Sequence, residues 1–249
     1  MDFKNCRVVA LDFDGTLAKT DYHLNARTAT YKSLALETGD KRYDIDEQLH
    51  LQASEQATTP EGINAYILAA KGIISTVDPM HDSVKNVVDQ VQQMYQQIIR
   101  NGQDEIPGSV AFMRRLMVRR PGKVGIVTTA HEWEVNPFLD RYKLNRYFLR
   151  HKLVTREDLS SNTNVKPNSE AYEIFMERMG VKVASECLAI EDSKLGIEAA
   201  KKAGFLVIGL GYADKYNKLV TIDSEYKPDA VVHDYQELGT LIGVSLSGQ

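Results

Sequence analysis

Cysteine is scarce in this chain of 249 residues, and the two cysteines, Cys6 and Cys187, lie far apart in the sequence. They do not stand in a spacing typical of metal binding or of redox chemistry, so neither a disulfide framework nor a thiolate metal site has support. We expect two buried, reduced thiols.

Long apolar runs are missing as well. No segment approaches the length that a transmembrane helix needs, and the first residues, MDFKNCR, lack the apolar stretch of a secretion signal. We therefore expect no membrane association and a cytoplasmic location.

An excess of charge of one sign is also lacking. Thirty basic and thirty-four acidic residues give a formal net charge of −4, which provides no electrostatic reason to bind a polyanion. The most basic stretch, residues 114–123, has no interleaved aromatic side chains and is typical of a solvated helix face. We expect no nucleic-acid partner, and a monomer or a weak homodimer.

Five short apolar segments alternate with segments of helical period. The first, RVVALDF at residues 7–13, is rich in branched side chains and stops at Asp14 and Gly15, as a buried parallel strand does. The others are residues 123–128, 186–190, 205–209 and, more weakly, 230–232. Helical periodicity fills residues 110–119, 133–142, 169–179 and 195–203. This alternation predicts an α/β fold with a doubly wound, Rossmann-like parallel sheet.

Residues 19–105 interrupt the alternation. They contain no convincing strand and several polar runs of helical period, at residues 24–37, 47–57 and 84–100. Pro107 and Gly108 then mark the return to the sheet. We predict two domains, because the chain is long enough for one core with an inserted lobe. Residues 1–18 and 106–249 would form the α/β core, and residues 19–105 an all-helical cap.

The residues that close each predicted strand are the candidates for function. Ligands of open α/β sheets bind beyond the carboxyl ends of the strands. The polar residues at these ends are Asp12, Asp14, Thr128, Glu191 and Asp192.

Asp12 and Asp14 stand two residues apart in an extended segment, so both side chains project to the same side. A divalent cation relieves their repulsion, and so does a proton on one carboxyl, which is the state that a general acid needs. We expect Asp12 to be a nucleophile that forms an acyl phosphate and Asp14 to protonate the leaving alkoxide. Gly15 lets backbone amides approach phosphate oxygens.

Two structural interpretations compete with catalysis at this motif. A strand could simply end in an acidic turn. The second alternative is a calcium-binding loop that begins at Asp12, and the spacing of the residues excludes it. Such a loop needs glycine at its sixth position and glutamate at its twelfth, where this chain has Leu17 and His23.

Four segments resemble the motifs of the haloacid-dehalogenase-like hydrolases. They are LDFDGTL, IVTT, VKP and AIEDSKLGIEAAKKAG, and they occur in the order and strand context of that superfamily, from residue 12 to residue 192. The chain is similar to the branch that contains phosphoglycolate phosphatase and β-phosphoglucomutase. In that branch a helical cap is inserted between the first and second motifs, as residues 19–105 are here.

The resemblance implies a role for each matched residue. Asp12 would be the nucleophile, and Asp14 the general acid and base. Thr128 would bind the transferring phosphoryl group, and Lys166 would neutralise the phosphate and the nucleophile. These residue types suit phosphoryl transfer, which needs compensation of the charge on the equatorial oxygens.

The resemblance also implies a magnesium site. Asp192 would ligate Mg²⁺ with support from Glu191, together with Asp12 and the backbone carbonyl of Asp14. Independently, Mg²⁺ in proteins usually takes one or two carboxylates and completes its octahedron with water and substrate phosphate. Asp12 and Asp192 meet that need.

The chain departs from this branch after Thr128 and Thr129, where relatives often place a lysine or arginine that holds phosphate. His131 and Glu132 occupy that region, and we expect Thr129 and His131 to contact substrate because they follow a strand end. His23, where the cap begins, is a further candidate for substrate contact, since mutase-like relatives also tend to carry a histidine there. An ordinary helix-surface residue is the alternative.

The sequence therefore predicts a Mg²⁺-dependent phosphatase that hydrolyses a small phosphorylated metabolite through a covalent aspartyl-phosphate intermediate. Two alternatives stay open. One is a sugar-phosphate mutase of the β-phosphoglucomutase type, which shares the whole core. The other is a non-catalytic sensor of a phosphorylated ligand.

Overall fold

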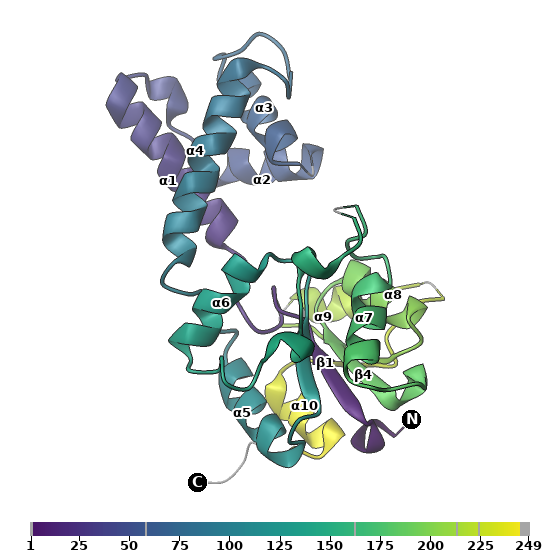
Figure 1. The fold of residues 1–249 in the computed structure, drawn as a ribbon. Coiled ribbons are helices and arrows are strands. Elements are labelled where there is room, and N and C mark those ends of the chain that lie inside the picture. Colours follow the sequence, from purple (N-terminus) through teal and green to yellow (C-terminus); the bar gives the residue numbers. More distant parts are fainter. Residues whose placement is uncertain (1, 58, 162, 213, 224, 245–249) are drawn as a thin grey trace. The chain divides into compact units, whose positions relative to one another are not determined.

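A computed structural model of the chain describes residues 2–57, 59–161, 163–212, 214–223 and 225–244. Within these residues the chain forms ten α-helices and six strands. It divides into two compact units, one of Met1–Lys19 with Gly102–Gln249 and one of Thr20–Asn101. The strands belong to the first unit, which we call the α/β unit, and the second is the helical unit (Figure 1).

The α/β unit is built on a parallel sheet with the strand order β3-β2-β1-β4-β5-β6. The doubly wound α/β fold predicted from the sequence is confirmed. One strand, β3, was not predicted, because two residues are too short a run to leave a periodic signal. The strands are β1 (Val8–Leu11), β2 (Val124–Val127), β3 (Leu153–Val154), β4 (Cys187–Glu191), β5 (Leu206–Leu210) and β6 (Ala230–Val232).

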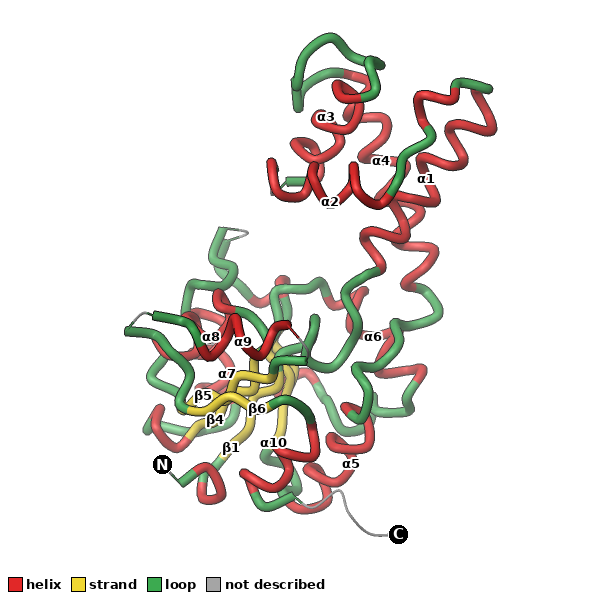
Figure 2. Tube along the Cα trace, turned by 180° about the vertical axis from the view of Figure 1, so that it is seen from behind, coloured by secondary structure: helices red, strands yellow, loops and turns green. Residues whose placement is uncertain are grey.

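Helices cover both faces of this sheet (Figure 2). Val9 and Leu11 of β1 pack in the apolar cluster that includes α5, α6 and α10, whereas Val8 and Ala10 pack in the cluster with α7 and α8. Successive side chains of a strand point to opposite faces, so β1 has to be apolar throughout. The helices are α5 (Ser109–Arg119), α6 (Glu132–Arg141), α7 (Glu170–Arg178), α8 (Lys194–Lys202), α9 (Asp214–Val220) and α10 (Tyr235–Ile242).

The helical unit contains α1 (Tyr22–Thr38), α2 (Glu47–Gln56), α3 (Pro60–Ala70) and α4 (Asp82–Ile99). Helix α3 was not predicted from the sequence, although it has a clear start signal. Thr59 caps it by accepting a hydrogen bond from the amide of Gly62, and Pro60 stands in the first turn, where its missing amide costs nothing. In the part of the chain that is described, no helix combines the length and apolarity needed to cross a bilayer.

A buried polar pair makes the stability of the helical unit depend on pH. Arg27 of α1 donates to a ring nitrogen of His50 in α2 at 3.0 Å, and both side chains are buried. Burial, and then the charge of Arg27, lowers the pKa of His50 to about 4. Between pH 6.5 and pH 4 the unfolded chain therefore binds a proton that the folded unit does not. The contribution of His50 to the stability of the helical unit is therefore lost as the pH drops through that window.

We expect the melting temperature of the helical unit to decrease from pH 6.5 to pH 4 more steeply in the wild type than in His50→Gln. Glutamine can still accept from Arg27 but cannot take up a proton. Circular dichroism melts across this range measure the slope, and His151→Gln, at an exposed position of the α/β unit, serves as the control. Equal slopes in the wild type and His50→Gln would show that His50 does not carry the effect.

Candidate active site

The register of the sheet gathers the candidate residues at one edge. Leu11 of β1 pairs with Ile126 of β2 on one side and with Ile190 of β4 on the other. Asp12 and Glu191, the next residues along β1 and β4, therefore emerge level at the carboxyl ends of adjacent strands. The chain continues from β1 to β2 and β3 on one side, whereas β4, β5 and β6 lie on the other. Open α/β sheets bind ligands at such a switch point.

Three buried carboxylates meet here. One oxygen each of Asp12, Glu191 and Asp192 lies within 4.8 Å of the others. Burial, and then the charge of Asp12, raises the pKa of both Glu191 and Asp192 above their ordinary values. Oε2 of Glu191 is buried and has no hydrogen-bond partner among the described residues. A set of oxygen ligands that repel one another in this way suits a divalent cation.

Lys166 supplies a positive charge at the centre of the site. Its ammonium donates to Oδ1 of Asp12 at 2.5 Å, to Oε1 of Glu191 at 2.6 Å and to the carbonyl oxygen of Val127 at 3.1 Å. Burial alone would lower the pKa of Lys166, but Asp12 and Glu191 outweigh it and raise this pKa above its usual value. Lys166 therefore remains charged and connects the ends of β1, β2 and β4.

Asp14 is half-buried, whereas Asp12, Glu191 and Asp192 are buried. Burial, and then the charges of Asp12 and Glu134, raises the pKa of Asp14 to about 8. Its carboxyl group therefore carries a proton at neutral pH, as a general acid must. Gly15 follows at φ 77°, and a Cβ at this position would overlap the carboxylate of Asp192. The loop that follows β1 approaches Asp192 so closely that this position requires glycine.

Thr128 and Thr129 form the turn that follows β2. Thr128 is buried, its amide donates to the carbonyl of Val154 at 3.0 Å, and its hydroxyl accepts from the amide of Ala130 at 3.0 Å. A hydroxyl that accepts one hydrogen bond can still donate its own proton to a ligand. Thr129 is half-buried in the same turn. Thr128 follows directly on Val127, whose carbonyl oxygen accepts a hydrogen bond from Lys166.

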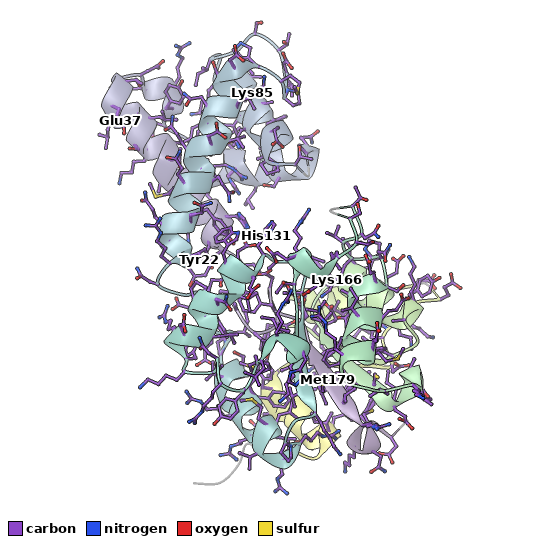
Figure 3. The ribbon with its side chains drawn as sticks, viewed as in Figure 1. Tyr22, Glu37, Lys85, His131, Lys166 and Met179 are labelled. Carbon is purple, nitrogen blue, oxygen red and sulfur yellow. The ribbon has the colours of Figure 1, made fainter. Side chains whose placement is uncertain are left out.

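The two candidate histidines belong to different units. His131 precedes α6 at the edge of the α/β unit where Lys166 also lies (Figure 3), and its Nδ1 contacts Oε1 of Glu157 at 2.8 Å. His23 belongs to α1 of the helical unit, where its ring stacks on Tyr95 of α4 with 3.9 Å between the ring centroids. The structure thus brings together the predicted acids and Lys166 beside the Thr128 turn, whereas the described contact of His23 lies within the helical unit.

Two residues that were not predicted from the sequence touch the carboxylates. Tyr172 of α7 is buried and donates to Oε1 of Glu191. Lys215 of α9 donates to Oδ2 of Asp192. Lys215 follows β5, which ends at the same edge of the sheet, so that strand end was a usable signal. Tyr172 is an aromatic residue in a segment of helical period, and no sequence signal separates it from ordinary core packing.

Comparisons with known proteins point to one family. A family model described as haloacid dehalogenase-like hydrolase matches residues 6–204. Phosphoglycolate phosphatase from Pseudomonas fluorescens is 25% identical, over 93% of this chain and 78% of that protein. Phosphoglycolate phosphatase from Escherichia coli is 24% identical, over 97% of this chain and 94% of that protein.

Solved structures share the fold. A putative β-phosphoglucomutase from Thermotoga maritima superposes with a TM-score of 0.72 at 23% identity, over 96% of this chain and 99% of that chain. A HAD family hydrolase from Deinococcus radiodurans, solved with bound phosphate and sodium, has a TM-score of 0.69 at 19% identity, over 98% of this chain and 100% of that chain.

Proposed function

Because this chain belongs to the haloacid dehalogenase-like hydrolases, we propose that it hydrolyses a small phosphorylated metabolite through a Mg²⁺-dependent, covalent phosphoryl transfer to Asp12. The family and the hydrolase class expected from the sequence are confirmed, and the phosphoglycolate phosphatase relatives support a phosphatase. The proposal of a Mg²⁺-dependent covalent transfer to Asp12 depends mainly on one observation. Lys166 contacts Asp12 inside the group of three buried carboxylates.

The donor set fits Mg²⁺. Asp12 and Asp192 would hold the ion with Glu191 in support, and Asp14 would add its backbone carbonyl oxygen. Oε2 of Glu191, buried without a partner among the described residues, is the kind of oxygen that a bound cation, or a water on it, would satisfy. When bound, the ion offsets negative charge on the transferring phosphoryl group.

The side chains divide the remaining work. Lys166 holds Oδ1 of Asp12, which leaves Oδ2 to attack the phosphorus atom. Asp14, protonated at neutral pH because of its raised pKa, gives its proton to the leaving oxygen. The resulting carboxylate then removes a proton from the water that attacks phosphorylated Asp12. The hydroxyl of Thr128 donates to a phosphoryl oxygen.

We propose that Gly15, Thr129 and His131 contact the substrate around its phosphoryl group. His23 is the candidate for substrate contact from the helical unit. We propose that residues 19–105, the predicted cap, select the substrate. Phosphoglycolate is the first compound to test, because it is the substrate in the name of relatives such as the Escherichia coli protein, which aligns over 97% of this chain and 94% of its own length. Sugar phosphates come next, since they distinguish a phosphatase from a mutase.

A panel of phosphorylated metabolites tests the proposal by the release of inorganic phosphate. We expect at least one monoester to be hydrolysed with Mg²⁺, the rate to fall to background after chelation with EDTA, and the rate to return when Mg²⁺ is restored. Hydrolysis of none of the compounds would contradict the proposed function. Conversion of a sugar phosphate into its isomer, with little free phosphate, would favour the mutase.

Asp14→Asn should slow the first turnover of alkyl phosphates by about a hundredfold or more. Asparagine cannot protonate the leaving oxygen, whereas p-nitrophenolate leaves without a proton. First-turnover rates for p-nitrophenyl phosphate should therefore decline much less than those for an alkyl phosphate. An equal loss for both substrates would remove Asp14 from the role of general acid.

A further inference from the structure

Lys215 reaches the active site from a part of the chain that the proposed mechanism does not use. It lies in the first turn of α9, just beyond β5, where its amide donates to the carbonyl of Tyr212 at 3.0 Å. Its ammonium donates to Oδ2 of Asp192. The same ammonium lies 3.1 Å from the position that a Cβ on Gly15 would occupy. Lys215 therefore stands where the first loop and Asp192 meet.

Two ammonium groups, rather than one, balance the carboxylates. Lys166 forms ion pairs with Asp12 and Glu191, and its side chain is only 8% exposed. Lys215 forms an ion pair with Asp192, and its side chain is 48% exposed. Lys166 is enclosed by three hydrogen-bond acceptors. Lys215 contacts the single carboxylate of Asp192 and is itself open to solvent. Lys215 can turn into solvent and keep its own charge hydrated, whereas Lys166 cannot.

A divalent cation at Asp192 must share its carboxylate oxygens with this ammonium. The two positive charges repel each other at short range, and Oδ2 cannot serve both fully. We propose that Lys215 is an internal cation that holds Asp192 while no metal is bound and is displaced when Mg²⁺ binds. Lys215 thereby sets the Mg²⁺ concentration at which the enzyme becomes loaded. This inference rests on the proposed function, because it takes Asp192 as a metal ligand.

Competition of this kind has two linked consequences. If Lys215 weakens Mg²⁺ binding by some factor, Mg²⁺ weakens the stabilising contact of Lys215 by the same factor. Lys215→Met should thus bind Mg²⁺ more tightly. It should also melt at a lower temperature than the wild type in EDTA, because Asp192 has lost its counter-ion, and this difference should shrink at saturating Mg²⁺.

Isothermal titration of the whole chain with MgCl₂ measures the first consequence without any substrate. We expect the Kd for Mg²⁺ to be about tenfold lower in Lys215→Met. It should be unchanged in Lys215→Arg, which keeps the charge, and in Lys218→Met, which removes an exposed lysine from the same helix. Melting curves in EDTA and in saturating MgCl₂ measure the second. We expect the same change in Kd and in melting temperature for Lys215→Gln, which replaces Lys215→Met if that variant does not fold.

The possible results separate this inference from the proposed function. An unchanged or weaker Mg²⁺ affinity in both neutral variants overturns the role of Lys215 and leaves the phosphatase proposal intact. A melting difference of the same size with and without Mg²⁺ does the same, because it marks a purely structural contact. Failure of the wild type to bind Mg²⁺ overturns the metal site and the inference together.

Discussion

Asp12→Asn should abolish phosphate release, with kcat lowered by about four orders of magnitude or more. The amide has nearly the same shape as the carboxylate, and its oxygen can still accept from Lys166, but it cannot attack phosphorus to form an acyl phosphate. Initial rates with p-nitrophenyl phosphate at saturating Mg²⁺ measure the loss. Circular dichroism should show an intact fold.

The matched control is Asp82→Asn, which changes a fully exposed aspartate at the start of α4. We expect this variant to retain the wild-type rate, because its carboxylate lies in solvent at a helix end. Mg²⁺-dependent turnover that persists in Asp12→Asn would refute Asp12 as the nucleophile, whatever the control shows.

Lys166→Met should reduce both stability and activity. Without the ammonium, the buried carboxylates of Asp12 and Glu191 lose their shared cation, which costs about 3–5 kcal/mol in the free energy of unfolding. Turnover should fall by about a hundredfold or more, because Asp12 is no longer held and the phosphate loses a positive charge. Urea unfolding followed by the fluorescence of Trp133, the single tryptophan, reports on the α/β unit.

The control for this variant is Lys202→Met. Lys202 pairs with Glu198 one turn earlier on α8, and both side chains are partly exposed. Surface pairs of this kind contribute at most about 1 kcal/mol. If Lys166→Met lowers the free energy of unfolding by no more than this control does, the buried cation is not the group that stabilises the strand ends.

The parts of the fold that the sequence predicts well are those buried on two sides. The run at residues 7–13 is recognisable because Val8 to Leu11 pack alternately on two layers of helices. Strand β3 offers only Leu153 and Val154, and its assignment depends on pairing with β2 rather than on its own composition. Local pattern thus predicts the centre of the sheet better than its edge.

The candidate site is predictable to the extent that it follows from strand ends. Asp12, Asp14, Glu191 and Asp192 all stand where an apolar run stops, and parallel pairing alone brings such ends together. Tyr172 and Lys215 reach Glu191 and Asp192 from helices, so their contacts depend on how α7 and α9 pack rather than on spacing. The raised pKa of Asp14 likewise depends on burial and on Glu134, a neighbour distant in sequence.

Trapping the intermediate tests most directly whether the phosphoryl group passes through Asp12. Asp14→Asn, which should hydrolyse the intermediate slowly, is mixed with Mg²⁺ and p-nitrophenyl phosphate, quenched in acid during the first turnover, digested and analysed by mass spectrometry. We predict one added phosphoryl group on the peptide that contains Asp12, sensitive to hydroxylamine and absent when Asp12→Asn is also introduced. Release of p-nitrophenol without any phosphorylated peptide, or with the group on another residue, would contradict the proposed mechanism.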